Sequence, residues 1–370
     1  MDVGSHSSSG PYEDYLCDRA SAYEQPILGT FELTPVCNMS CNMCYVRMKK
    51  SQVDSLGGLQ PEEFWINLAK EAMDNGLLFL LLTGGEPLIY PNFRSLFTKL
   101  QSMGLFITMN TNGTLIDEDM AKFFHDHMLR RLNITIYGKD NETYERLCHN
   151  PQGFTQLERA IHYLKKYDVP VRLNCSITSQ NYEQLDDFYR IAEEWEVPIE
   201  ISYFMFPPNR REDKEHFEQY RMTAEQTAKI AYAIHTHNYS KEQKKEYAKA
   251  KLEHMEEYKN DKELKGGFYC RAGNSSFWIN WQGKMVPCGI MNGPVHDICT
   301  DGFKKCWDDV LVDVKKIKLS EKCFRCEKHE ICPHCAAVEI AECGEFGISP
   351  DYPCQIADFY KDLLLKELEQ

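Results

Sequence analysis

The chain has 370 residues, of which 43% are apolar and 26% charged, and its formal net charge is −14. This composition is typical of a soluble globular protein with one large domain or two ordinary ones, and the negative charge argues against an extended phosphate-binding surface, so we expect no nucleic-acid partner. The longest apolar run, LLFLLL at residues 77–82, is far below the roughly 20 residues of a membrane helix, so we expect no membrane span.

The amino-terminal residues have neither the basic start nor the apolar stretch of a secretion signal. We therefore expect a cytoplasmic protein, with residues 1–26 forming an extension before the first strand. Short apolar runs then alternate with amphipathic segments. The strand candidates are 27–34, 77–83, 105–112, 131–137, 170–178 and 198–206.

Two of the intervening helices have clear sequence signals. One follows Pro61, which stands at a first-turn position, and it ends at Gly76. Another, GFTQLERAIHYLKKYDV, places Leu157, Ile161 and Leu164 on one stripe. Such βα repetition predicts a parallel sheet covered by helices over residues 27–206. Periodicity alone allows either an open doubly wound sheet or a barrel.

Residues 207–267 are rich in Lys, Glu and Tyr and carry no strand signal. We expect two helices here, at 223–237 and 241–259, which bridge to a second domain. Gly266 and Gly267 mark the expected boundary. The second domain, residues 268–370, is rich in cysteine and is expected to need metal to form a core, apart from an amphipathic helix over the last 15 residues.

Sixteen cysteines in a chain without an export signal favour metal binding over disulfides. Cys37, Cys41 and Cys44 lie in one loop directly after the first expected strand, at the carboxyl end where α/β proteins place active sites. Three thiolates on a four-iron cluster leave one iron open for a substrate or cofactor. A zinc site completed by a distant residue is the alternative.

This trio, followed by the aromatic Tyr45, resembles the signature of radical S-adenosylmethionine enzymes. The resemblance implies a partial (β/α)6 barrel of the TIM type and a 4Fe-4S cluster whose open iron is chelated by the methionine moiety of S-adenosylmethionine. The segment TGGEPL at 83–88 is similar to the family motif that contacts the methionine amino group. Gly84 and Gly85 allow backbone to approach a ligand, and Glu86 can accept from an ammonium.

Weaker elements follow the later strands. The resemblance places Asn112 and Gly113 near the ribose, although a plain turn is an equal alternative. It places Thr135 near the cofactor, and Tyr45 where backbone contacts adenine. Arg172 and Asn174 lie on the fifth expected strand and are further candidates for cofactor contacts.

The carboxyl-terminal cysteines resemble the SPASM domain, which binds two auxiliary 4Fe-4S clusters, so that three clusters are expected in all. Carried over by position, the resemblance assigns Cys270, Cys288 and Cys335 to the first auxiliary cluster. It assigns to the second auxiliary cluster Cys323, Cys326, Cys332 and Cys354. A zinc ribbon is the alternative for this region.

Two departures from the SPASM pattern stand out. The spacing between Cys332 and Cys335 is one residue shorter than usual, and fully ligated members carry a further cysteine where this chain has only Ser275 and Ser276. The first auxiliary cluster is therefore expected to have an open iron or to borrow a ligand. The candidates are Cys299, Cys306 and Cys343, of which we expect the first two to be small buried hydrophobes.

The resemblance implies reductive cleavage of S-adenosylmethionine to a 5′-deoxyadenosyl radical, with electrons from an external donor of the flavodoxin or ferredoxin type. Peptide modification in natural-product maturation is our first expectation: a thioether or carbon–carbon cross-link, or a side-chain oxidation. The sulfatase-maturing branch has an Asp after the cysteine matching Cys288, where this chain has Gly289. Too few residues precede the first strand for a leader-binding domain, so a separate leader-binding protein is one expected partner.

Three further expectations remain open. The substrate could instead be a protein or small molecule, and a non-catalytic iron–sulfur electron carrier is the alternative of another class. Trp278 and Trp281 flank the cluster region and are expected in the core, with contact to the substrate as the alternative. No general acid or base can be assigned from the sequence.

Overall fold

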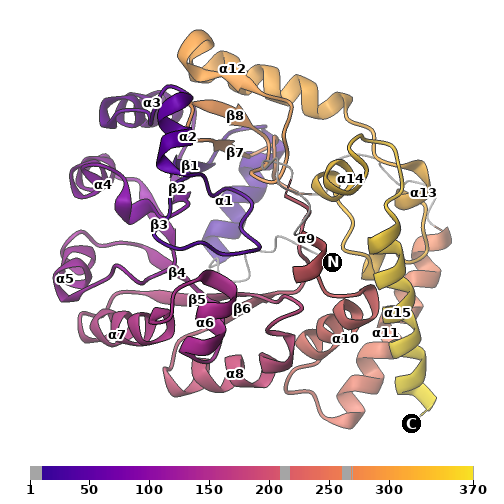
Figure 1. Ribbon diagram of the computed structural model, residues 1–370. Helices are drawn as coiled ribbons and strands as arrows, with labels where there is room; N and C mark the ends of the chain where they lie inside the picture. Colours follow the sequence, from indigo (N-terminus) through magenta and orange to yellow (C-terminus); the bar gives the residue numbers. More distant parts are fainter. Residues whose placement is uncertain (1–10, 209–216, 261–267, 269, 370) are drawn as a thin grey trace.

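A sheet of nine strands organises the molecule (Figure 1), for which we use a computed structural model. It describes residues 11–208, 217–260, 268 and 270–369. The expected boundary at Gly266 and Gly267 lies outside these residues. The strand order is β6-β5-β4-β3-β2-β1-β7-β8-β9.

The first six strands all run parallel to their neighbours, as the βα alternation predicts. They curve into a partial barrel with the helices on its outside (Figure 1), which confirms the expected fold class. Each lies within the expected range or one residue beyond it: β1 Leu28–Thr34, β2 Phe79–Gly84, β3 Phe106–Thr111, β4 Arg131–Ile136, β5 Val171–Ser176 and β6 Ile199–Ser202.

Alternate residues of these strands face opposite environments. One set, including Phe31, Leu82 and Leu132, is apolar and fully buried in the core between the sheet and its helices. The other set points into the barrel and is largely polar, for example Asn110 and Asn174, which line cavities there. The period of two therefore separates a dry outer face from a polar interior.

The helices α3 and α7 lie close to their expected positions. Helix α3 begins at Glu62, because Pro61 has an extended backbone and precedes the helix rather than opening its first turn. The helices that accompany the barrel are α1 Pro11–Ala22, α2 Lys50–Ser55, α3 Glu62–Asp74, α4 Phe93–Ser102, α5 Glu118–Asp126, α6 Asn141–Cys148, α7 Gly153–Lys166 and α8 Leu185–Glu194.

The cysteine-rich segment does not begin a separate sheet. Strand β7 (Ser276–Ile279) pairs in parallel with β1, and β8 (Lys284–Val286) and β9 (His296–Asp297) extend the sheet antiparallel. Helix α12 (Ile298–Lys316), which the sequence analysis did not anticipate, packs its buried side chains into the same core as the barrel helices.

A second core joins the expected bridge to the end of the chain. It contains buried residues of α10 (Ala224–His235), α11 (Lys241–Asn260) and α15 (Asp351–Glu369), and it includes Tyr360. The remaining helices are α9 Phe217–Tyr220, α13 Glu321–Phe324 and α14 Ala336–Cys343. Among the described residues, no helix is both long enough and apolar enough to cross a membrane.

Candidate metal and cofactor site

The cysteine trio borders a cavity of about 310 Å³ at the carboxyl ends of the barrel strands, which we call the loop cavity. The trio occupies the loop that follows β1, and the later strands contribute polar side chains. The lining residues that the sequence analysis had singled out are Cys37, Cys41, Cys44, Tyr45, Gly84, Gly85, Asn112, Thr135 and Asn174. The fold thus brings the trio and these strand-end residues to one place.

Donors from the surrounding backbone already face two of the trio's sulfurs. The amide of Met39 donates to Cys37 Sγ at 3.3 Å, and the amide of Arg47 donates to Cys44 Sγ at 3.3 Å. Burial nevertheless raises the pKa of the Cys37 thiol to about 12. A thiol this reluctant to ionise becomes a thiolate when a metal ion supplies positive charge, so the trio suits iron or zinc.

A fourth thiol lies beside the trio and was missed in the sequence. Cys148, at the end of α6, hydrogen-bonds to Cys41 and lowers the pKa of that thiol. Two backbone hydrogen bonds hold the end of α6 against the cysteine loop. The amide of Ser40 donates to the carbonyl of Cys148 at 3.0 Å, and the amide of Asn42 donates to the carbonyl of Leu147 at 3.0 Å. No sequence pattern near residue 148 predicts the contact with Cys41, because that contact forms only when the chain is folded.

Gly84 and Gly85 hold the end of β2 against the loop that leads to Cys37. A Cβ on Gly84 would lie 2.3 Å from the carbonyl oxygen of Thr34, and one on Gly85 would lie 2.4 Å from that of Val36. The amide of Gly85 donates to the Thr34 carbonyl at 2.6 Å. Only glycine permits this approach, as expected, although the nearest backbone is the cysteine loop.

The carboxylate of Glu86 is buried behind the cavity instead of lining it. It accepts from the hydroxyl of Thr111 at 2.9 Å, from the amide of Asn112 at 2.9 Å and from the amide of Leu88 at 3.1 Å. Burial raises the pKa of this carboxyl to about 7. These three donors brace the carboxylate, and the expected contact between the Glu86 side chain and an ammonium stays a prediction.

Asn112 connects the end of β3 to the trio. Its side-chain amide donates to Asn38 at 2.9 Å and approaches Cys37 Sγ at 3.6 Å, and its oxygen accepts from the amide of Thr114 at 3.0 Å. Gly113 has a φ of +75°, so this segment is a tight turn that also faces the cavity. The turn is thus observed, and the expected position of Asn112 and Gly113 near the ribose stays a prediction.

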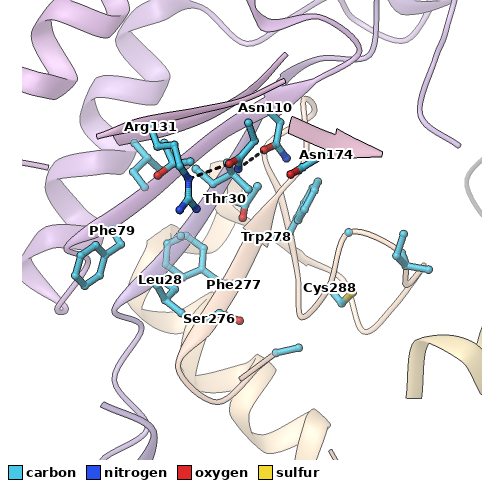
Figure 2. A pocket seen from close by; sticks show the side chains of 18 of the residues that line it. Leu28, Thr30, Phe79, Asn110, Arg131, Asn174, Ser276, Phe277, Trp278 and Cys288 are labelled. Atoms are coloured by element: carbon cyan, nitrogen blue, oxygen red, sulfur yellow. Dashed lines mark hydrogen bonds between the residues drawn. The ribbon is translucent and has the colours of Figure 1, made fainter. Parts of the chain in front are cut away.

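A second cavity, of about 390 Å³, occupies the interior of the barrel, and we call it the barrel cavity (Figure 2). Three residues, Tyr45, Asn110 and Asn174, line both cavities and join them. The side-chain oxygen of Asn174 is buried and has no hydrogen-bond partner among the residues that the structure describes. An unsatisfied buried oxygen at this junction calls for a donor from a bound molecule.

Arg172 lines the barrel cavity and not the loop cavity. Its guanidinium pairs with Glu200 of β6 at 2.5 Å. Its nearest polar neighbours on β4 form a chain, since Arg131 donates to Asn133 at 3.0 Å and Asn133 donates to Asn110 at 2.9 Å. The position of Arg172 therefore favours contact with a molecule in the barrel cavity over the contact with the cofactor that the sequence led us to expect.

Trp278 of β7 also lines the barrel cavity (Figure 2), and its indole donates to the buried Glu32 at 3.0 Å. The expectation of a core position was wrong for Trp278, whereas Trp281 is only 3% exposed. Gly289 packs on the same ring, since a Cβ there would lie 2.6 Å from an indole carbon. A side chain at 289 would therefore displace Trp278.

The cysteines expected at the first auxiliary cluster lie near one another. Burial raises the pKa of Cys335 to about 12, and the neighbouring Cys288 and Cys270 raise it further. Cys288 also lines the barrel cavity. Ser275 is fully buried and bonds to the hydroxyl of Ser21 at 2.7 Å, so its hydroxyl is engaged with α1.

The three cysteines that could have completed this set have other surroundings. Cys306 is fully buried among apolar residues, as expected, but Cys299 is exposed at the start of α12 beside Gln60, so that expectation was wrong. Cys343, at the end of α14, lies among groups that include Cys323 of the other set.

The cysteines expected at the second auxiliary cluster also come together. Burial raises the pKa of Cys332, and the neighbouring thiols that raise it further are Cys354, Cys323 and Cys326. A His–Glu pair, missed in the sequence, stands behind this set. His334 hydrogen-bonds to Cys323 and to Glu339, the latter at 2.8 Å.

The carboxylate of Glu339 is fully buried and fixes three segments around Cys323. Besides His334, it accepts from the amide of Ser320 at 2.7 Å and from that of Gly347 at 2.9 Å. Second-sphere hydrogen bonds of this kind orient metal ligands. The chemistry of all three cysteine sets fits iron–sulfur clusters, which are held by thiolates.

Comparisons with known proteins agree with this geometry. Residues 31–193 match the model of the Radical SAM superfamily. The AdoMet-dependent heme synthase of Methanosarcina barkeri is 25% identical over 87% of this chain and 94% of its own length. The sporulation killing factor maturation protein SkfB of Bacillus subtilis is 28% identical, over 48% of this chain and 40% of its own.

A solved structure shares the fold over almost the entire chain. SuiB of Streptococcus suis bound to precursor peptide SuiA superposes with a TM-score of 0.66 at 17% identity, covering 92% of this chain and 81% of SuiB. At that identity the likeness concerns the fold, including the arrangement of the carboxyl-terminal segment around the barrel.

Proposed function

The chain is an enzyme with a radical SAM domain, and from this premise we propose that it cleaves S-adenosylmethionine and oxidises a substrate held in the barrel cavity. A 4Fe-4S cluster on Cys37, Cys41 and Cys44 would supply the electron that breaks a carbon–sulfur bond of S-adenosylmethionine and yields the 5′-deoxyadenosyl radical. The observation that carries the proposal is the junction of the two cavities at Tyr45, Asn110 and Asn174. The non-catalytic electron carrier is incompatible with the premise.

The residues of the loop cavity would hold S-adenosylmethionine by polar contacts. The backbone of Gly84 and Gly85 lines the cavity and offers carbonyl groups to an ammonium. Thr135 and Asn112 offer side-chain donors and acceptors. The bracing of Glu86 fixes the turn at Asn112, so that these groups keep their positions when a ligand enters.

The cysteine-rich segment would hold two auxiliary 4Fe-4S clusters. The first, on Cys270, Cys288 and Cys335, would adjoin the barrel cavity through Cys288, where it could take an electron from the substrate radical that hydrogen abstraction leaves. The second, on the set around Cys323 and Cys332, lies toward the second core. Electrons for the whole cycle would come from an external carrier of the flavodoxin or ferredoxin type.

A peptide is the first candidate substrate. The fold shared with SuiB, whose structure was solved with a precursor peptide, supports it. The reaction would then be a thioether or carbon–carbon cross-link or a side-chain oxidation, and a separate leader-binding protein could deliver the peptide.

An iron porphyrin is the second candidate, and one observation favours it specifically. The heme synthase of Methanosarcina barkeri matches 87% of the chain, a share too large to stop before the cysteine-rich segment, whereas the peptide maturase SkfB matches 48%. This segment contributes Cys288 and Trp278 to the barrel cavity. A relative that is similar in this segment therefore says more about the substrate than a relative that is similar only in the barrel.

The test begins with anaerobically reconstituted protein. We expect about twelve irons per chain, four for each of three clusters, and release of 5′-deoxyadenosine from S-adenosylmethionine under strong reductant. Iron without any release would refute the proposed cleavage, and about four irons with bound zinc would refute the auxiliary clusters. Incubation with iron coproporphyrin, or with peptides encoded near the gene, followed by mass spectrometry then separates the two substrate classes.

A further inference from the structure

The charged side chains of the barrel cavity gather along one wall. Arg131 begins β4 and Arg130 directly precedes it. Arg172 lies on the neighbouring β5, and Glu200 lies on β6. Glu13 of α1 also borders the cavity. Strand register places Asn133 of β4 opposite Arg172, so the guanidiniums of adjacent strands face the same space.

Positive charge exceeds negative charge on this wall. Three arginines and two glutamates are the charged residues among those described as lining the cavity, which leaves an excess of one positive charge. Arg130 pairs with Glu13 and Arg172 with Glu200. Burial lowers the pKa of Arg131 to about 10, and the neighbouring Arg172 and Arg130 lower it further.

Burial also lowers the pKa of Arg172, although Glu200 opposes the shift. Its side chain is only 12% exposed. Neighbouring guanidinium groups that are buried repel one another. An anion that binds between them stabilises their charged form, since the attraction between opposite charges is stronger in less polar surroundings.

The facing wall of the cavity is apolar. Phe79 of β2 stacks near the guanidinium of Arg130, whose central carbon lies 5.5 Å from the ring centre. Leu28 and Trp278 continue this wall toward Cys288, and Arg131 stands at the other end of the cavity (Figure 2). A molecule that fills the space would meet aromatic and aliphatic carbon on one side and arginine on the other.

We propose that Arg131 and Arg172 form a subsite for a carboxylate of the substrate, with the apolar body of that substrate against the wall of Phe79, Leu28 and Trp278. This inference rests on the proposed function in taking the barrel cavity as the substrate site. Guanidinium binds carboxylate through two parallel hydrogen bonds, which fixes orientation as well as affinity. The reactive part of the substrate is thereby held toward the junction at Asn110 and Asn174.

The same chemistry has two sources. A peptide offers acidic side chains and a terminal carboxylate, and a porphyrin offers propionates. Two matched probe pairs separate these sources: iron coproporphyrin with its tetramethyl ester, and an acetylated Phe-Glu-Phe amide with the corresponding Phe-Gln-Phe amide. Within each pair only the carboxylate differs.

Binding of the four probes is measured by anaerobic calorimetry on the cluster-loaded protein. In at least one pair we expect the probe that carries the carboxylate to bind about tenfold or more tightly than the neutral probe. The reason is that the neutral probe leaves the buried arginines without an anionic partner. Arg131→Gln and Arg172→Gln should each reduce this preference about fivefold or more, whereas Arg131→Lys should retain part of it. Gln at 131 can still donate to Asn133, which limits disturbance of the strand.

Arg190→Gln is the matched control, since Arg190 of α8 lies on the surface and, among the described residues, pairs with Asp187 and Glu194 of its own helix. The pair that shows the preference identifies the source of the carboxylate. Absence of any preference in the native protein, or its retention in both glutamine variants, overturns the proposal. Release of 5′-deoxyadenosine by the native protein is recorded separately, so failure of the proposed function is distinguishable from failure of the carboxylate subsite.

Discussion

Adding one methyl group at Gly85 should disable the cysteine loop. The Cβ of Gly85→Ala would lie 2.4 Å from the carbonyl oxygen of Val36 and 2.7 Å from that of Pro35, both backbone atoms. Reaching an ordinary contact of 3.4 Å requires the loop to move by about 1 Å. Overpacking of this kind costs about 1–3 kcal/mol of stability.

The displaced segment directly precedes Cys37, so the strain reaches the trio. A misplacement of about 1 Å at a reacting centre lowers rates by about a hundredfold. We therefore expect Gly85→Ala to fold, to bind less iron at the trio and to release 5′-deoxyadenosine at about 1% of the native rate. The measurements are iron and sulfide content, thermal unfolding, and 5′-deoxyadenosine release under strong reductant.

Gly293→Ala provides the size control. A Cβ at Gly293 meets nothing within 4 Å among the described residues, and Gly293 lacks a positive φ. It should keep native iron content and rate. If Gly85→Ala keeps at least half the native rate with full iron content, the inference that this close approach positions the trio is wrong.

The remaining predictions concern three other parts of the chain. Simultaneous replacement by Ala of Cys37, Cys41 and Cys44 should abolish 5′-deoxyadenosine release while leaving about eight of twelve irons on the auxiliary sets, as iron analysis will show. Glu339→Gln should lower the free energy of unfolding by about 2 kcal/mol, measured by denaturant titration, because the amide can no longer accept from all three buried donors. His235, whose pKa burial lowers to about 4, should make the protein less stable in acid. The unfolded chain binds the proton below about pH 6.5 and the folded chain does not, so unfolding at pH 5.5 should require about 1.4 kcal/mol less than at pH 7.5.

Matched variants control the last two of these predictions. Glu345→Gln changes an exposed side chain near Glu339 and should leave the unfolding free energy within about 0.5 kcal/mol of native. His235→Gln removes the titrating ring, so its acid destabilisation should shrink by the same 1.4 kcal/mol. An equal pH response in native protein and His235→Gln, or an unchanged unfolding free energy in Glu339→Gln, contradicts the corresponding account.

The barrel was predictable because its signals are local. Each strand combines an apolar run with a period of two, and each helix combines caps with an apolar stripe, so both appear in short windows of sequence. The cysteine trio and Gly84-Gly85 are also contiguous. Their approach in space follows from their shared position at strand ends, which parallel topology brings to one edge.

Contacts between distant segments were not predictable in the same way. Cys148 reaches Cys41 only because α6 ends beside the cysteine loop, and no pattern near residue 148 encodes that neighbour. The surroundings of Glu86 were not predictable for a similar reason. Its carboxylate is bound by donors from β3 and the following turn, whose proximity depends on strand pairing.

The polar interior of the barrel could also have been predicted from the sequence. The segments RLNIT on β4 and VRLNCS on β5 alternate apolar with Arg, Asn or Thr, whereas strands buried on both faces are expected to be almost continuously apolar. That alternation indicates a barrel lined for a polar occupant. It points to the same arginines that the structure places in the barrel cavity.

The pairing of β7 with β1 explains why the proposed site cannot be divided between two domains. An expected boundary near residue 267 separates the trio from the auxiliary cysteines in sequence, but the sheet continues across it through four paired positions, from Leu28 with Ser276 to Phe31 with Ile279. Because of that pairing, Trp278 reaches Glu32, and the segment after β8 brings Cys288 to the barrel cavity. A fragment that ended at residue 206 would keep the trio but lose one wall of the substrate cavity. The cleavage of S-adenosylmethionine proposed at the trio and the electron acceptor proposed at Cys288 therefore depend on one continuous sheet.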